Sequence, residues 1–201
     1  MRALRNGFKR AGHLLLALTL SLTLALPIQA ARDVIEANDV RLEPAESPEA
    51  GWMLSATFLV ELNARLEDVV NRGVPLYFVV EFELNRPRWY WLDEQAVSAT
   101  RSYRLSYHAL TRQYRVSFGA LQLGFATLRE ALDMLSHIRD WKVVERGVLK
   151  TGATYAGALR MRLDIAQMPK PFQINAITNR DWTLASEWYR FGFTPVSEVT
   201  R

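Results

Sequence analysis

The sequence predicts a mainly β domain, an antiparallel β-sandwich or curled sheet with two short helices. In most segments apolar residues alternate with other residue types, as expected for strands that bury one face. Two other segments carry apolar residues at helical spacing instead. Because these helical segments do not alternate regularly with the strands, a parallel α/β sheet is not expected.

Strong period-two alternation predicts three long strands. It runs through residues 52–62, 76–84 and 155–165, and Glu81 and Glu83 fall on the second face of the middle segment. Residues 103–107 and 114–118 also alternate and flank a short polar turn, which predicts a hairpin. Shorter strands are expected at residues 34–42, 89–92 and 141–145.

The two predicted helices have recognisable start signals. Thr127 and Glu130 form a capping-box pattern at the start of the longer helix. Its apolar stripe consists of Leu128, Ala131, Leu132, Leu135 and Ile138. The shorter helix follows Asn63, a suitable N-cap, and ends before Gly73 and Pro75.

Two segments near the C-terminus are harder to assign. Residues 181–191 are compatible with either a strand or a helix, because apolar residues fit both periods. Pro169 and Pro171 stand at alternate positions, which predicts an extended path that leaves the sheet.

The first thirty residues have the order of a secretory signal peptide. Four basic residues come first, an apolar run follows at residues 14–26, and Pro27 and Ala30 stand near the end. We therefore expect a signal peptide at residues 1–30, a single periplasmic domain at residues 31–201, and periplasmic localisation. The alternative is a retained inner-membrane anchor, since residues 11–31 contain no charged side chain.

The charge distribution argues against a nucleic-acid partner. Four of the 25 Lys and Arg residues lie in the leader and none of the 21 acidic residues does, so residues 31–201 carry equal numbers of both signs. Acidic residues predominate before Gln95 and basic residues after it, so we expect ion pairs between the two halves. The chain has no cysteine and must be stabilised without disulfides.

The most unusual local stretch combines arginines with consecutive aromatic residues. Three large aromatic side chains in a row cannot all face one core, and flanking arginines allow cation–π contacts. This stretch is the predicted binding site, for a sugar ring, a peptide or a lipid headgroup, and it consists of Arg86, Arg88, Trp89, Tyr90 and Trp91. The alternative is that Trp89 and Trp91 belong to the core.

Other candidate sites are weaker, and we expect no catalytic residue, no metal and no cofactor. Glycoside hydrolysis can use paired carboxylates, for which the candidates are Glu81, Glu83, Asp93 and Glu94. Asp133 and His137 are spaced to share a helix face with Glu130 and could bind a metal with a third ligand. The alternative is a solvated helix face on which Asp133 and His137 form a hydrogen bond.

The segments GVPLYF, RPRWYW, YRLSY, TLREAL, PKPFQINA and DWTLASEW occur in this order along the chain. Taken together, they resemble an uncharacterised family of exported bacterial proteins, domain of unknown function 4390. The resemblance covers about residues 34–193 and implies a Gram-negative envelope protein. It implies no activity, catalytic residue or cofactor, although genes of such proteins are associated with a membrane sensor kinase.

These observations predict a non-enzymatic periplasmic binding or accessory module with an unknown envelope protein or ligand as partner. The membrane would be contacted only through an uncleaved leader. The alternatives are an envelope hydrolase that uses the paired carboxylates, and a membrane-tethered accessory of a sensor kinase.

The leader prediction is tested by N-terminal sequencing of the protein purified from its native envelope. We expect the chain to begin at Ala31, because cleavage after Ala30 leaves a small residue at the end of the leader. Recovery of a membrane-bound chain that begins at Met1 would instead establish the anchor.

Overall fold

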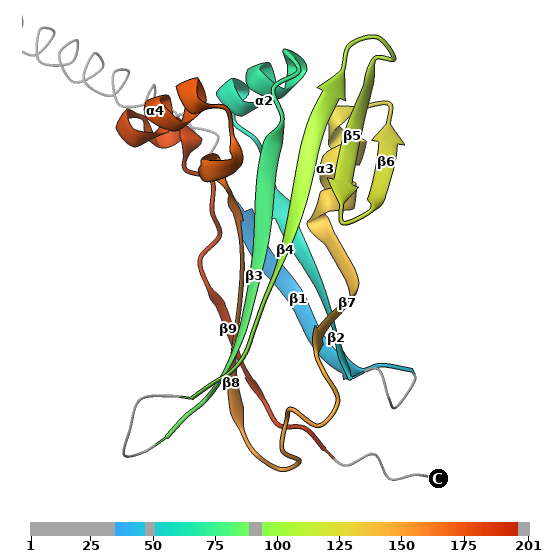
Figure 1. Cartoon of the computed structure of the whole chain (residues 1–201), viewed down its shortest axis with the longest axis vertical. Helices are drawn as coiled ribbons and strands as arrows, with labels where there is room; N and C mark the ends of the chain where they lie inside the picture. The colour runs from blue at the N-terminus through green and yellow to red at the C-terminus, as the bar shows by residue number, and fades with distance from the viewer. Residues whose placement is uncertain (1–34, 47–50, 89–93, 197–201) are drawn as a thin grey trace, which may run out of the picture. The chain divides into compact units, whose positions relative to one another are not determined.

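The computed structural model describes residues 35–46, 51–88 and 94–196. Nine strands form two antiparallel sheets in this part of the chain (Figure 1), with the orders β1-β2-β7 and β6-β5-β4-β3-β8-β9. The strands are β1 (Ile35–Pro44), β2 (Trp52–Val60), β3 (Leu76–Arg86), β4 (Glu94–His108), β5 (Gln113–Phe118), β6 (Leu121–Phe125), β7 (His137–Val144), β8 (Tyr155–Leu163) and β9 (Tyr189–Phe193). The predicted mainly β, antiparallel class is confirmed.

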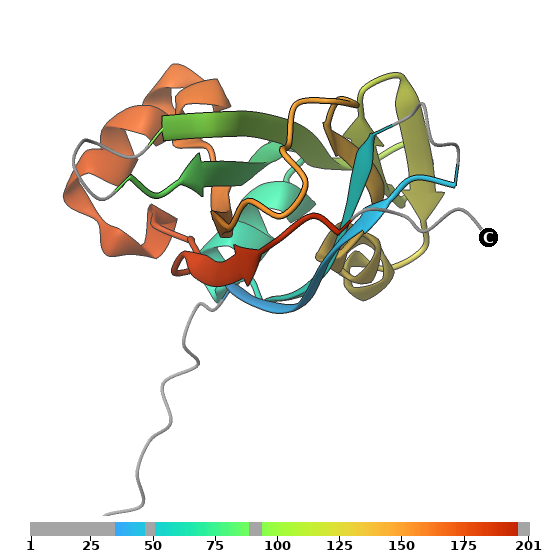
Figure 2. The same ribbon diagram turned by 90° about the horizontal axis from the view of Figure 1, so that it is seen from below.

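The helices cover the ends and edges of the sheets. The α-helices are α2 (Ala64–Asn71), α3 (Leu128–Ser136) and α4 (Lys170–Thr178), and the short 3-10 turns are η1 (Ile165–Gln167) and η2 (Arg180–Trp182). Helix α3 contacts β5 and β6, whereas α4 contacts η1 and η2 on the other side of the central strands (Figure 2). The described part of the chain therefore has one α-helix more than the sequence predicted.

The core is organised around β3, which pairs with β4 on one side and with β8 on the other. All five of its inward-facing side chains are completely buried, and they are Leu76, Phe78, Val80, Phe82 and Leu84. They belong to one apolar cluster with the inward-facing residues of the smaller sheet, including Leu54 and Phe58. The alternation in the sequence therefore predicted the buried face correctly.

The predicted hairpin is the β4–β5 pair. Tyr107 lies opposite Tyr114 and Leu105 lies opposite Val116. The two tyrosine rings are 4.9 Å apart between centroids, a tilted contact between cross-strand neighbours. Arg112 has a φ of 50° in the turn, so the reversal is made by a residue in the left-handed region.

Both predicted helix starts are confirmed, but one helix ends earlier than expected. Asn63 Oδ1 accepts a hydrogen bond of 2.8 Å from the Leu66 amide, and Thr127 and Glu130 complete the capping box. Helix α3 ends at Ser136, since His137 has extended backbone angles and begins β7. Ile138 is therefore buried from a strand, and its assignment to the helical stripe was wrong.

The extended path predicted at the two prolines was also wrong, because this segment begins α4. Pro169 is the N-cap and Pro171 stands in the first turn, where the missing amide proton of proline costs no helical hydrogen bond. The amide of Phe172 donates to the Pro169 carbonyl at 2.9 Å. The Phe172 ring packs 5.5 Å from the buried Trp182 ring, which ties α4 to η2.

The segment that the sequence left open is extended over most of its length. Ala185 forms a bridge with Arg162, and β9 then pairs with β8. The predicted strands 34–42 and 141–145 correspond to β1 and to the second half of β7. The predicted strand 89–92 lies outside the described residues.

Gly157 is required where β8 meets β9, because a Cβ at this position would lie 2.5 Å from the Phe191 ring. We expect Gly157→Ala to lower the free energy of unfolding by about 1–3 kcal/mol, the usual cost of overpacking. Chemical denaturation measures this change.

Gly192 on β9 is the matched control, since a Cβ there meets nothing within 4 Å. Gly192→Ala is expected to leave stability unchanged or to raise it by up to about 1 kcal/mol. Equal losses in both variants would show that the Phe191 contact is not the cause.

Candidate functional site

The described part of the predicted arginine–aromatic site lies at one end of the six-stranded sheet. Arg86 is the last residue of β3 and lies opposite Glu94, the first residue of β4. Arg88 follows and forms a short ion pair with Glu94. Trp89, Tyr90 and Trp91 lie outside the described residues, so the structure tests neither their burial nor their exposure.

A depression of about 570 Å³ adjoins this end of β3 on the outer face of the sheet. Pro87, which stands between the two predicted arginines, is part of its lining. The described residues of its lining are Glu83, Asn85, Pro87, Thr154, Tyr155, Ala156, Gly157, Ala158, Trp188, Arg190, Phe191 and Gly192. We call this feature the outer-face depression.

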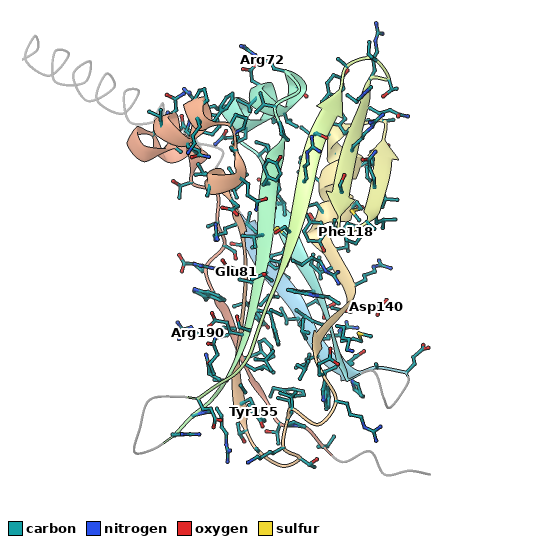
Figure 3. All side chains as sticks on the ribbon, viewed as in Figure 1. Arg72, Glu81, Phe118, Asp140, Tyr155 and Arg190 are labelled. Carbon is teal, nitrogen blue, oxygen red and sulfur yellow. The ribbon has the colours of Figure 1, made fainter. Side chains whose placement is uncertain are left out.

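The register of three strands gives the outer-face depression a floor of small residues. Ala158 lies opposite Glu83 of β3 and Arg190 of β9, and Ala156 lies opposite Gly192. Small side chains at these positions let a flat ligand approach the sheet closely. The half-buried Trp188 ring and the exposed Arg190 side chain complete the lining on the β9 side, where Figure 3 labels Arg190.

Beside the outer-face depression, an ionic network fixes the outer face of the sheet. Glu81 on β3 accepts a short hydrogen bond from Arg160 and one of 2.9 Å from Arg162, both on β8. The Arg160 guanidinium carbon lies 4.3 Å from the centroid of the Trp188 ring, within the range of cation–π contacts. Glu81 therefore holds Arg160, and Arg160 in turn supports the Trp188 ring.

This network includes part of the predicted pairing between the acidic and basic halves. Glu81 belongs to the acidic half and its two arginine partners to the basic half. Arg65 and Asp181 also join the halves, at 3.3 Å. Other ion pairs are local, as between Arg88 and Glu94.

The ion pairs lower the pKa of two proposed catalytic carboxylates. Burial alone would raise the pKa of Glu81, but the hydrogen bonds and charges of Arg160 and Arg162 outweigh burial and lower it below 4.5. The hydrogen bond from Arg88 lowers the pKa of Glu94 in the same direction. Both groups are therefore poor proton donors near neutral pH. Asp93, another hydrolase candidate, lies outside the described residues.

The possible metal ligands on α3 are used for other contacts. The Glu130 carboxylate accepts hydrogen bonds from the amides of Ala126 and Thr127 at the helix start. His137 Nδ1 lies 2.7 Å from the Asp133 carbonyl oxygen and 3.8 Å from its carboxylate. Within the described residues, no group of three His, Cys, Asp or Glu side chains is arranged to hold a metal ion.

The domain of unknown function DUF4390 matches residues 33–192, most of the chain. The chain belongs to this family. No curated protein and no solved structure matches the chain significantly.

The predicted site residues that the structure describes, Arg86 and Arg88, do not line the outer-face depression of this DUF4390 protein, although Pro87 between them does. Sequence reasoning did not propose Trp188 and Arg190, which line it, or Arg160, which supports the Trp188 ring. The pairing of β8 with β3 and β9 brings these distant parts of the chain together. The only local signal was the polar second face of β8, on which Arg160 and Arg162 alternate with apolar residues.

Glu81→Gln is expected to lower the free energy of unfolding at pH 7 by about 1–3 kcal/mol, because the three partly buried, charge-assisted hydrogen bonds from Arg160 and Arg162 are weakened. Since the folded pKa is below the unfolded value, the stabilisation is present above pH 4.5 and is lost as the pH falls through the folded pKa. Denaturation of both proteins between pH 7 and pH 3 measures the difference, which should shrink toward low pH.

Glu83→Gln is the matched control, two positions along the same strand face. Glu83 has no ion pair within the described structure, so we expect a change below about 0.5 kcal/mol. A pH-independent loss in Glu81→Gln would argue against the charged network as its source.

Proposed function

We propose that this DUF4390 protein is an exported, non-enzymatic binding module of the bacterial envelope that takes its ligand in the outer-face depression. The observation that carries the proposal is the position of Trp188, whose half-buried ring is supported by Arg160 and lines the depression. The leader at residues 1–30 supports the periplasm as the place of action.

The chemistry of the lining favours a saccharide as the ligand. An aromatic ring such as Trp188 can stack on the apolar face of a sugar. Glu83, Asn85 and Arg190 offer a carboxylate, an amide and a guanidinium, which together can accept from and donate to sugar hydroxyl groups. The small floor residues permit contact over a whole ring. A peptide or lipid headgroup would need a stronger charge or a deeper apolar pocket than this lining provides.

The hydrolase alternative has less support than binding. Glu83 is the one carboxylate among the described residues that line the outer-face depression, whereas retaining and inverting glycosidases both need two. Glu81 and Glu94 have lowered pKa values, which opposes a role as general acid.

The sensor-kinase alternative depends on whether the leader is retained. Among the described residues no helix has the length and apolar character needed to cross a membrane. Sequencing of the N-terminus therefore decides between the free module and the tethered one.

The binding proposal is tested with purified peptidoglycan sacculi in a co-sedimentation assay and with soluble chitin oligosaccharides by tryptophan fluorescence. We expect the wild-type chain to bind at least one of these probes. Trp188→Ala should weaken binding at least tenfold, because stacking on the ring is lost. Arg88→Ala combined with Tyr90→Ala tests the contribution of the predicted cluster.

The control is Leu110→Ala. Leu110 is 93% exposed in the β4–β5 turn, at the opposite end of β4 from Arg86 and the depression. This variant should bind as the wild type does. Failure of the wild type to bind both probes, or equal affinities of Trp188→Ala and wild type, would refute the saccharide proposal.

A further inference from the structure

A second feature, Arg101, lies on the opposite face of the six-stranded sheet from Arg190. Arg101 pairs with Val80 of β3 and occupies the inward-facing register of β4, between Ala99 and Tyr103. The other inward-facing positions of β4 from Val97 to Leu105 are uncharged. Burying a charge on a core face is costly unless the charge has a partner, so this position needs an explanation.

Two aromatic rings hold the Arg101 guanidinium. Its central carbon lies 5.0 Å from the centroid of the Trp141 ring on β7 and 5.9 Å from the centroid of the Phe118 ring on β5. Figure 3 labels Phe118. Tyr103 stands two positions along β4 on the same face and is buried. Contacts with ring faces leave the N–H groups at the edge of the guanidinium available for hydrogen bonds.

The charge of Arg101 is not neutralised by the described part of the protein, since none of the described carboxylates forms an ion pair with it. Arg101 lines a cleft of about 560 Å³ between β4, β5, α3 and β7. The described lining of this cleft also holds a second arginine, Arg139, and one carboxylate, Asp133, both exposed, so the arginines outnumber the carboxylate. The cleft is therefore positively charged.

The remaining described lining is Tyr103, Phe118, Met134 and His137, of which Phe118 and Met134 form an apolar part. We propose that this cleft is a second binding site, which takes a small, partly apolar organic molecule through its oxyanion group, a carboxylate or a phosphate. The Arg101 guanidinium donates two parallel hydrogen bonds to the oxyanion, and Arg139 adds a second positive charge. Phe118 and Met134 contact the apolar body of the molecule. This site does not depend on the saccharide proposal, because the two sites share no lining residue.

The test is an NMR titration of the protein purified after expression of the full chain, with the arginine Nε–H groups observed directly. Inorganic phosphate and hexanoate are added separately at constant ionic strength, with chloride as the balancing anion, so that screening stays fixed. We expect a saturable shift of the Arg101 signal with at least one probe. A response to phosphate alone identifies the phosphate class, and a response to hexanoate alone identifies a carboxylate on an apolar body.

Two substitutions separate anion binding from a purely structural role. Arg101→Gln removes the charge, and Arg101→Lys keeps the charge but removes the planar fork, so each should weaken binding at least tenfold. Arg104→Gln is the matched control, because Arg104 is exposed on the other face of β4. The affinity of this variant for the probe should stay within twofold of wild type.

The proposal is overturned if the wild type gives no saturable response to either probe. It is also overturned if Arg101→Lys binds within twofold of wild type. A structural role alone would change the melting temperature of the Arg101 variants while the wild type showed no anion-dependent shift. The wild-type titration tests oxyanion binding in the cleft even if Arg101→Gln does not fold.

Discussion

The structure depends on the burial of one strand, β3, between its two neighbours and under the smaller sheet. The chain has no cysteine, so no disulfide can limit the freedom of its unfolded state. Stability must come from apolar contact and from hydrogen bonds along β3, β4 and β8. The complete burial of all five inward-facing side chains of β3 reflects this requirement.

The opposite face of β3 carries an ionic network at its middle, beside the buried Val79. Glu81 stands at the middle of this strand with its side chain only 17% exposed, and a carboxylate so little solvated needs close cationic partners. Arg160 and Arg162 on β8 supply them. The same arginine that neutralises Glu81 also supports the Trp188 ring, so the stability of the sheet and the shape of the outer-face depression have a common cause.

Local patterns predicted most of the described strands and both capped helices, because alternation and capping are properties of a few neighbouring residues, but they did not predict β6 and left β9 open. The predictions were wrong where one pattern is compatible with two structures. Pro169 and Pro171 are compatible with an extended segment or with a helix start. Ile138 fits the period of α3 although it lies in β7. Neither proposed binding site could be predicted completely from the sequence. The outer-face depression needs the register of β3, β8 and β9, and Arg101 interrupts the apolar alternation of β4 for a reason visible only once Trp141 and Phe118 lie beside it.

The order of the strands along the chain has a kinetic consequence. Strand β3 meets its first neighbour, β4, within a few residues, but its second neighbour, β8, begins about seventy residues after β3 ends. Closing so long a loop delays the completion of the sheet. A chain that is synthesised from its N-terminus can therefore not complete the six-stranded sheet until nearly all of it has been made, because β8 and β9 come last in the sequence.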